Sequence, residues 1–149
     1  MSSHIKKLGI VGDDHKDEQL ITELLSWMYQ NKADYTNTFC FLMNEYDPKN
    51  EIYKKKQFIL WKKKWENRIN LNNNSKENSI KIMSKVNPLV IPRNYLVEES
   101  LKYATEKDDL SKVNDLLKVL KKPYERVSAT SIYQSTPFPE ENYVTYCGT

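Results

Sequence analysis

The sequence predicts an all-α fold of five or six helices that is followed by an extended C-terminal tail. Three observations predict it. Apolar side chains recur every three or four positions along most of the chain, only three glycines interrupt 149 residues, and the Pro137-Phe138-Pro139 sequence forbids a helix near the C-terminus. We therefore divide the chain into a helical segment, residues 1–126, and an aromatic-rich tail, residues 127–149, that ends in Cys-Gly-Thr.

Two helices are expected in the first third of the chain. Residues 17–31 carry an apolar stripe at helical spacing behind a group of acids, and acidic side chains stabilise the N-terminus of a helix. Asp34 can cap the next helix, which has an apolar face and a polar, uncharged face. Thr36, Asn37 and Thr38 make up the polar face, which suits contact with another layer of protein better than contact with water.

Residues 51–69 are predicted to form one long, lysine-rich helix. Its apolar side chains fall on a single stripe, and lysines flank that stripe, which consists of Phe58, Trp61, Trp65 and Ile69. Lysine interleaved with tryptophan can bind single-stranded nucleic acid or lie on an anionic membrane. The spacing favours a buried stripe with a solvated lysine face instead, because stacking on bases needs exposed rings.

Capping residues and prolines set the boundaries of the next two helices. Ser75 can cap a helix that ends at Asn87-Pro88, because proline restricts the residue before it to extended conformations. Pro92 lacks an N–H and has a φ suited to a first helical turn, so another helix is expected from about residues 92–94 to residue 106.

A last helix is expected to complete a helix-turn-helix hairpin. Asp108 offers an oxygen that can cap it, and Pro123 closes it after two lysines. Its apolar residues recur at helical spacing: Leu110, Val113, Leu116, Leu117 and Leu120.

Composition limits the function classes. The excess of 23 basic over 20 acidic residues gives a net charge of +3, which is too small to indicate nucleic-acid binding. No apolar run approaches the ~20 residues of a membrane span, and residues 1–10 lack the apolar segment of a signal peptide. Cys40 and Cys147 are too few for a disulfide framework or a zinc cluster and suit a reducing compartment. We therefore expect a soluble, cytoplasmic protein that binds neither membranes nor nucleic acid.

The chain carries no known motif for catalysis or for a bound cofactor. Its three glycines form neither a GxGxxG loop nor a Walker loop, the two common loops that hold phosphate. The Asp13-Asp14-His15 run could be imagined as a set of metal ligands, but no second cluster completes a site, and acids at the start of a helix explain it better. We expect no catalytic, cofactor-binding or metal-binding residue in this chain.

Three ordered blocks of sequence resemble the selenoprotein O family, the YdiU-like protein adenylyltransferases with a kinase fold. The first block is KLGI followed by ADYTNTF, residues 7–10 and 33–39. The second is NPLVIPRNYLVEESL followed by LLKVLKKPYE, residues 87–101 and 116–125, and the third is the terminal YCGT, residues 146–149. Together they cover the final third or so of a family member.

The resemblance implies that the chain is the C-terminal helical portion, part of the C-lobe, of an enzyme that transfers AMP from magnesium-bound ATP to protein hydroxyl groups. The family residues that bind ATP and magnesium lie upstream of the matched segment, so the isolated chain is expected to be inactive and to hold neither. The implied partner is the upstream kinase-like catalytic lobe. We expect it to dock through Tyr35, Phe39 and the leucine stripe of the last helix.

Four residues remain as site candidates. The guanidinium of Arg93, which precedes Asn94, could bind a phosphate or carboxylate, or could pair with an acid or with carbonyl groups at a helix end. By resemblance, Cys147 is a redox residue whose disulfide partner lies upstream. Cys40 stands where the family usually has arginine, and it could replace that partner or be a small buried side chain.

A different function class also fits the sequence. The chain could be a free-standing helical interaction module whose lysine-rich helix, residues 51–69, binds an acidic partner or RNA. Binding through lysines should weaken steeply as salt rises, whereas docking of apolar side chains onto a catalytic lobe should resist salt.

Overall fold

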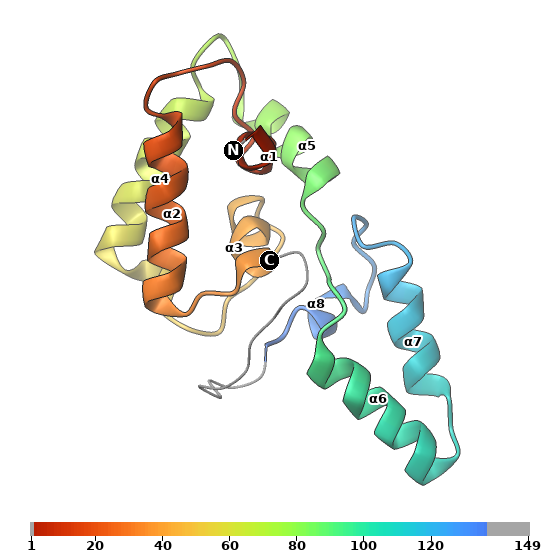
Figure 1. Cartoon of the computed structure of the whole chain (residues 1–149). Coiled ribbons are helices and arrows are strands. Elements are labelled where there is room, and N and C mark those ends of the chain that lie inside the picture. The colour runs from red at the N-terminus through yellow and green to blue at the C-terminus, as the bar shows by residue number, and fades with distance from the viewer. Residues whose placement is uncertain (1, 137–149) are drawn as a thin grey trace. The chain divides into compact units, whose positions relative to one another are not determined.

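The computed structural model describes residues 2–136, and every regular element in that range is helical (Figure 1). This confirms the all-α prediction. The described residues form eight α-helices and one 3-10 helix, more than expected, because helices as short as residues 2–7 and 130–133 are too short to show periodicity. The chain separates into two compact units, Met1–Asn87 and Pro88–Thr149. The expected division at residues 126–127 stays a prediction, since much of the tail, residues 137–149, lies outside the described residues.

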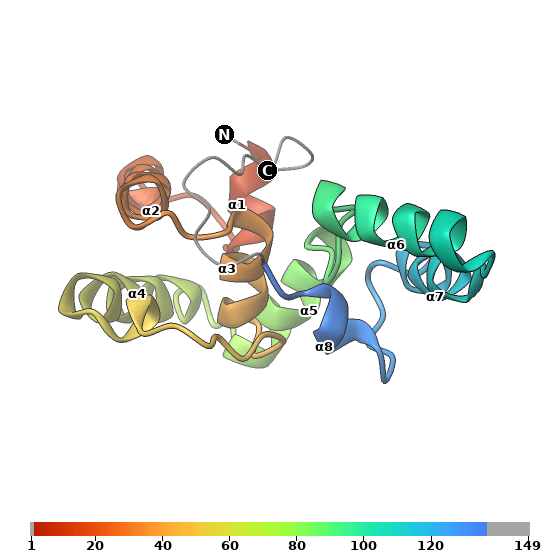
Figure 2. The same cartoon turned by 90° about the horizontal axis from the view of Figure 1, so that it is seen from below.

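The first unit contains six helices in which α2 and α4 lie side by side (Figures 1 and 2). Helix α1 packs against α2 and α5, and α4 also packs against α5. The helices are α1 (Ser2–Lys7), α2 (Asp17–Asn31), α3 (Tyr35–Leu42), the 3-10 helix η1 (Ile52–Lys54), α4 (Lys56–Ile69) and α5 (Lys76–Val86).

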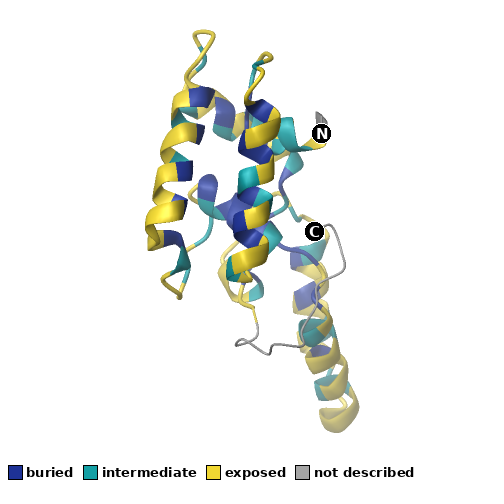
Figure 3. Ribbon diagram, turned by 60° about the vertical axis from the view of Figure 1, so that its left-hand side comes forward, coloured by how far each residue is buried: buried dark blue, intermediate teal, exposed yellow. Residues whose placement is uncertain are grey.

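The core of this unit is aromatic. Trp27, Phe58, Trp61 and Trp65 are each 5% exposed or less, and the buried positions of α4 follow one side of the helix in Figure 3. The indole N–H of Trp61 donates to the Leu20 carbonyl at 2.9 Å, and that of Trp65 donates to the Leu8 carbonyl at 2.8 Å. The predicted buried stripe is therefore confirmed, and these two bonds satisfy its polar atoms.

Local capping sets helix starts as expected at two places. The Asp34 carboxylate accepts a hydrogen bond from the backbone N–H of Asn37 at 2.9 Å, and the Ser75 hydroxyl accepts one from Asn78 at 3.1 Å. Helix α2 has the predicted bounds. The polar face of α3 is buried, and the Thr38 hydroxyl lies 2.9 Å from the Tyr53 hydroxyl, which confirms that this face contacts another layer.

The lysine-rich helix starts later than predicted. Lys55 has an extended backbone, with ψ of 141°, and it separates η1 from α4. The expected single helix over residues 51–69 is therefore a 3-10 turn followed by an α-helix that begins at Lys56.

The second unit contains the predicted hairpin, in which α6 (Asn94–Lys107) packs against α7 (Ser111–Leu120) (Figure 1). The cap between the two helices differs from the prediction. Asp108 ends α6 in the left-handed conformation, with φ of 50°, which aspartate tolerates better than most residues. Asp109 instead accepts a hydrogen bond from the Ser111 N–H at 2.8 Å.

The segment before the hairpin has no regular structure and is buried. The Leu89 N–H donates to the Pro123 carbonyl at 2.7 Å, and the Gln134 amide donates to the Leu89 carbonyl at 3.1 Å. A short helix, α8 (Thr130–Tyr133), lies where the tail was expected to be extended. The Thr130 hydroxyl accepts a hydrogen bond from the Val127 N–H at 2.8 Å, which stabilises the turn that leads into this helix.

Candidate functional site

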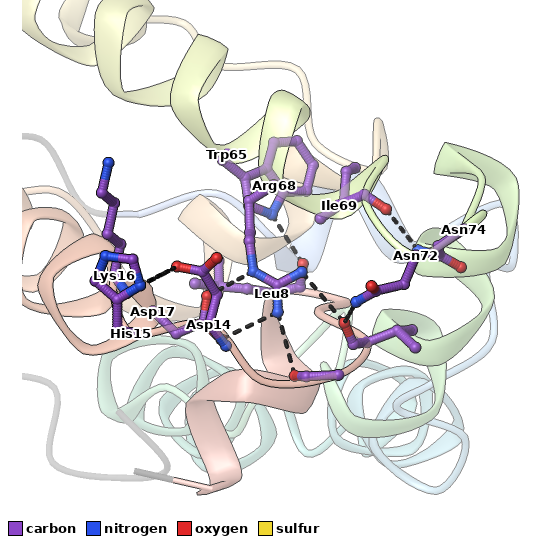
Figure 4. Close-up of polar contacts among 12 residues, drawn as sticks. Leu8, Asp14, His15, Lys16, Asp17, Trp65, Arg68, Ile69, Asn72 and Asn74 are labelled. Carbon is purple, nitrogen blue, oxygen red and sulfur yellow. Dashed lines mark hydrogen bonds and ion pairs between the residues drawn. The ribbon is translucent and has the colours of Figure 1, made fainter.

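A buried ion pair joins the end of α4 to the start of α2 (Figure 4). Arg68 Nε donates to one oxygen of Asp17 at 2.6 Å, and Nη2 donates to the other at 3.0 Å. The same guanidinium donates to the carbonyl of Val11 at 3.2 Å and to that of Gly12 at 3.1 Å. Arg68 and Asp17 are each 7% exposed, so the pair is shielded from water. We call this network the Arg68 clamp.

The position of Arg68 explains its burial. It follows Trp61 by seven residues and Trp65 by three, so the α-helical repeat places it on the buried face of α4. A charge carried inward needs a partner, and Asp17 supplies one. Hydrogen bonds to Asp17 raise the pKa of Arg68 above its ordinary value, although burial acts in the opposite direction. Sequence reasoning missed this pair, and an arginine on an apolar stripe is the signal that could have found it.

The clamp fixes the loop between α1 and α2. Gly9 and Gly12 both have positive φ, at 68° and 79°, and a Cβ on Gly9 would lie 2.6 Å from the Ser79 carbonyl oxygen. The Ser79 hydroxyl donates to the Gly9 carbonyl at 2.7 Å, and Asn72 donates to the Val11 carbonyl at 3.3 Å. Since the guanidinium is already hydrogen-bonded to two carboxylate oxygens and two carbonyl groups, the clamp is structural and does not form an anion site.

Two shallow depressions lie between α2 and α4, and the first of them adjoins the clamp. They have volumes of about 500 Å³ and about 720 Å³, and both are lined by Gln19, Glu23 and Lys64. In the smaller one Arg68 pairs with Asp17 and Lys64 lies 3.4 Å from Glu23, and acidic and basic side chains are equal in number. In the larger one Glu18 and Glu23 outnumber Lys64. Within residues 2–136 no three His, Cys, Asp or Glu side chains gather where they could hold a metal ion.

Arg93 and Asn94 lie at the start of α6. Arg93 is the N-cap residue, its carbonyl accepts hydrogen bonds from the N–H groups of Leu96 and Val97, and its side chain is 1% exposed. Asn94 is exposed. Such burial of the guanidinium supports the structural interpretation over contact with an anion from solvent.

Of the two cysteines, Cys40 lies within the described residues and Cys147 does not. Cys40 is 0% exposed on α3, which confirms that it is a small buried side chain. Cys147 lies outside the described residues, so its redox role and a bond to Cys40 stay predictions.

The expected docking residues are only partly available. Phe39 is 2% exposed, so it belongs to the core and cannot bind a partner. Tyr35 is half-buried, and its hydroxyl lies 3.1 Å from His4 Nε2. Burial, followed by the positive charges of the N-terminus and Lys7, lowers the pKa of His4. Of the leucine stripe on α7, Leu117 remains 46% exposed.

The lysine-rich face of α4 is not a platform for bases. Its tryptophans are buried, and Lys64 faces Glu23 while the Lys55 ammonium donates to the Asn31 amide oxygen at 2.7 Å. In the described part of the chain, no helix combines the length and the apolar character that crossing a membrane requires.

Comparison with known proteins places the chain in a family. The family described as protein adenylyltransferase SelO matches residues 1–121. Similar curated proteins are each called protein nucleotidyltransferase YdiU. The protein of Pelagibacter ubique is 46% identical over 96% of this chain, and that of Clostridium beijerinckii is 46% identical over 97% of it. The protein of Nitrosococcus oceani is 39% identical over 97% of this chain. The chain spans only about 30% of the length of these relatives. It belongs to the SelO family of protein adenylyltransferases.

Proposed function

We propose that this chain is the C-terminal helical portion of a SelO-family protein adenylyltransferase and serves as a scaffold for the catalytic portion. The observation that carries the proposal is its alignment, over 96% of its length, with about 30% of a protein nucleotidyltransferase. The terminal YCGT block and the order of the other two blocks support a C-terminal position. The parent reaction would be transfer of AMP from ATP to hydroxyl groups of proteins.

The site geometry supports a scaffolding role. The polar network in the first unit is hydrogen-bonded internally, and the described residues offer no donor set for a metal. We propose that ATP and magnesium are bound by the upstream kinase-like lobe, which is the proposed partner. We also propose a cytoplasmic location, which the small number of cysteines supports.

A chimera tests this function. The matched segment of the P. ubique relative is replaced by this chain, and transfer of radiolabelled AMP to protein is measured. The chimera should transfer AMP, and the isolated chain should not. The control is the relative from which the matched segment has been deleted. An inactive chimera, or a fully active deletion, would contradict the scaffold.

Cys147 is proposed as a redox residue of the assembled enzyme. In the chimera, mild oxidation should change the rate of AMP transfer, and the Cys147→Ser variant should lose that response. An unchanged response in the variant would assign the redox effect to another cysteine.

The alternative is a free-standing module that binds an acidic protein or RNA through the lysine-rich segment, residues 51–69. The exposed Lys54, Lys56 and Lys63 favour an acidic protein, whereas the buried tryptophans disfavour RNA. A binding constant for polyglutamate that falls steeply with salt, and that Lys63→Glu weakens, would support this module.

A further inference from the structure

We propose that one edge of α7, formed by Leu110 and Leu117 and called here the α7 strip, is the surface onto which the part of the SelO-family polypeptide outside this chain docks. The inference rests on the proposed scaffolding function and names its docking surface. The occupant should present an apolar centre with an acidic group on one side.

Helix α7 has a wide apolar arc. At about 100° per residue, the arc runs from Val119 through Leu116 to Leu117 and Leu110, and it spans roughly 180°. A core-facing helix has an apolar stripe of at least about 100°. The arc of α7 is therefore wide enough for a second packing surface beside the first.

The hairpin supplies one of these surfaces. Helix α7 packs against α6, and its Leu116 and Val119 are 5% and 3% exposed. At the other edge of the arc, Leu117 is 46% exposed and Leu110, the N-cap residue, is 63% exposed. The strip is therefore continuous with a buried core and is left uncovered by the described residues.

The exposed Ile59 lacks this continuity. Ile59 on α4 is 53% exposed, but the helical repeat places it between Lys55, Lys63 and Glu66. It therefore stands singly among charges, as surface apolar residues commonly do, and needs no partner.

A charge beside the strip indicates the chemistry of the occupant. The helical repeat places Lys121 on its open border, about 20° from Leu110, and Lys121 is exposed. An acidic group on the docking partner would complement this lysine.

The lengths of the relatives identify the occupant. The family match includes all of α7, because it extends to residue 121. Each relative also has roughly 70% of its chain outside the matched segment, given that the match covers about 30% of it. That polypeptide is joined covalently to the same helices in the relatives, so its effective concentration at the strip is high.

Cysteine labelling can detect whether the strip is covered. Leu110→Cys, Leu117→Cys and the matched control Lys118→Cys, which lies on the polar side of the same helix, are each made in a Cys147→Ser background. They are made in the full chain and in the P. ubique chimera. Maleimide reaction at each position is then followed by mass spectrometry of the peptides that contain it.

The proposal expects covering only in the chimera. Positions 110 and 117 should react about tenfold more slowly there than in the full chain alone, while position 118 should react at similar rates in both proteins. The same cysteines at the aligned positions of the full-length P. ubique relative give a second measurement, which decides the question if the chimera fails to fold.

Three results would overturn the proposal. Equal reaction at positions 110 and 117 in both proteins would show that the strip stays open. Protection in the full chain that grows with protein concentration would assign the strip to a second copy. Protection in the full chain that disappears when residues 137–149 are removed would assign the strip to the tail.

AMP transfer is measured on the same samples, so that failure of the docking surface can be told from failure of the proposed function. An active chimera with an open strip contradicts only the docking surface, and an inactive chimera with a covered strip contradicts only the function.

Discussion

Replacing Arg68 by methionine is expected to lower the free energy of unfolding of the first unit by about 3–5 kcal/mol, because it leaves a buried carboxylate without its counter-charge. Asp17 is 7% exposed, so water cannot replace the two lost bonds of 2.6 and 3.0 Å. The carbonyls of Val11 and Gly12 lose their donor as well. Since folded domains are stable by about 5–15 kcal/mol, the loss is a large share of the total.

Urea titration followed by tryptophan fluorescence measures this loss. All three tryptophans, at positions 27, 61 and 65, are buried in the first unit and report its unfolding. The control is Lys64→Met on the same helix, whose 62% exposed side chain lies 3.4 Å from Glu23 and should contribute less than about 1 kcal/mol.

A loss of less than about 1 kcal/mol for Arg68→Met, or one no larger than for Lys64→Met, would refute the argument from burial. The double variant Arg68→Met/Asp17→Leu should recover part of the stability, because it removes both buried charges. If it recovers none, the bonds to the carbonyls of the loop carry most of the effect.

Three further changes test other parts of the structure. Gly9→Ala should cost about 2 kcal/mol or more, since φ is 68° and the new Cβ would lie 2.6 Å from the Ser79 carbonyl oxygen; the same urea titration measures it, and a neutral result would contradict the geometry. Burial lowers the pKa of His4, so the unfolded chain binds a proton at a higher pH than the folded chain does. The free energy of unfolding should therefore fall as the pH drops from about 7.5 to 5.5, and His4→Gln should reduce that fall. The same pH dependence in both proteins would contradict the role of His4. In the full chain, Leu116→Ala should destabilise the hairpin by about 2–5 kcal/mol and Leu117→Ala by less than about 1 kcal/mol. Unfolding followed by far-UV circular dichroism measures both losses. Equal losses would show that Leu117 is buried in solution.

Short-range chemistry let the sequence predict much of the fold. Asp34 and Ser75 cap their helices through bonds to residues three positions ahead, so their neighbours alone determine the helix starts. The spacing of Trp61 and Trp65 likewise determined a buried face, because an α-helix repeats every 3.6 residues. The resemblance to the family was also available from the sequence, since it depends on residue order.

The different roles of Asp108 and Asp109 could not be predicted from local sequence. Asp108 can cap a helix, but its backbone turns left-handed and ends α6. The N-cap residue of α7 is Leu110, and the carboxylate of Asp109 accepts the hydrogen bond from the Ser111 N–H. A one-residue difference of this kind depends on how the hairpin closes, which no local pattern records.

By itself, the sequence determined that the chain is helical, where most of its helices begin and end, and which family it belongs to, because each of these follows from local spacing and residue order. Only the tertiary structure decided that Arg68 pairs with Asp17, 51 positions away, and that Leu116 is buried while Leu117 stays exposed. The physical reason is that burial depends on which surfaces meet. A helical repeat shows that a side chain lies on an apolar face, and only packing determines which part of that face is covered.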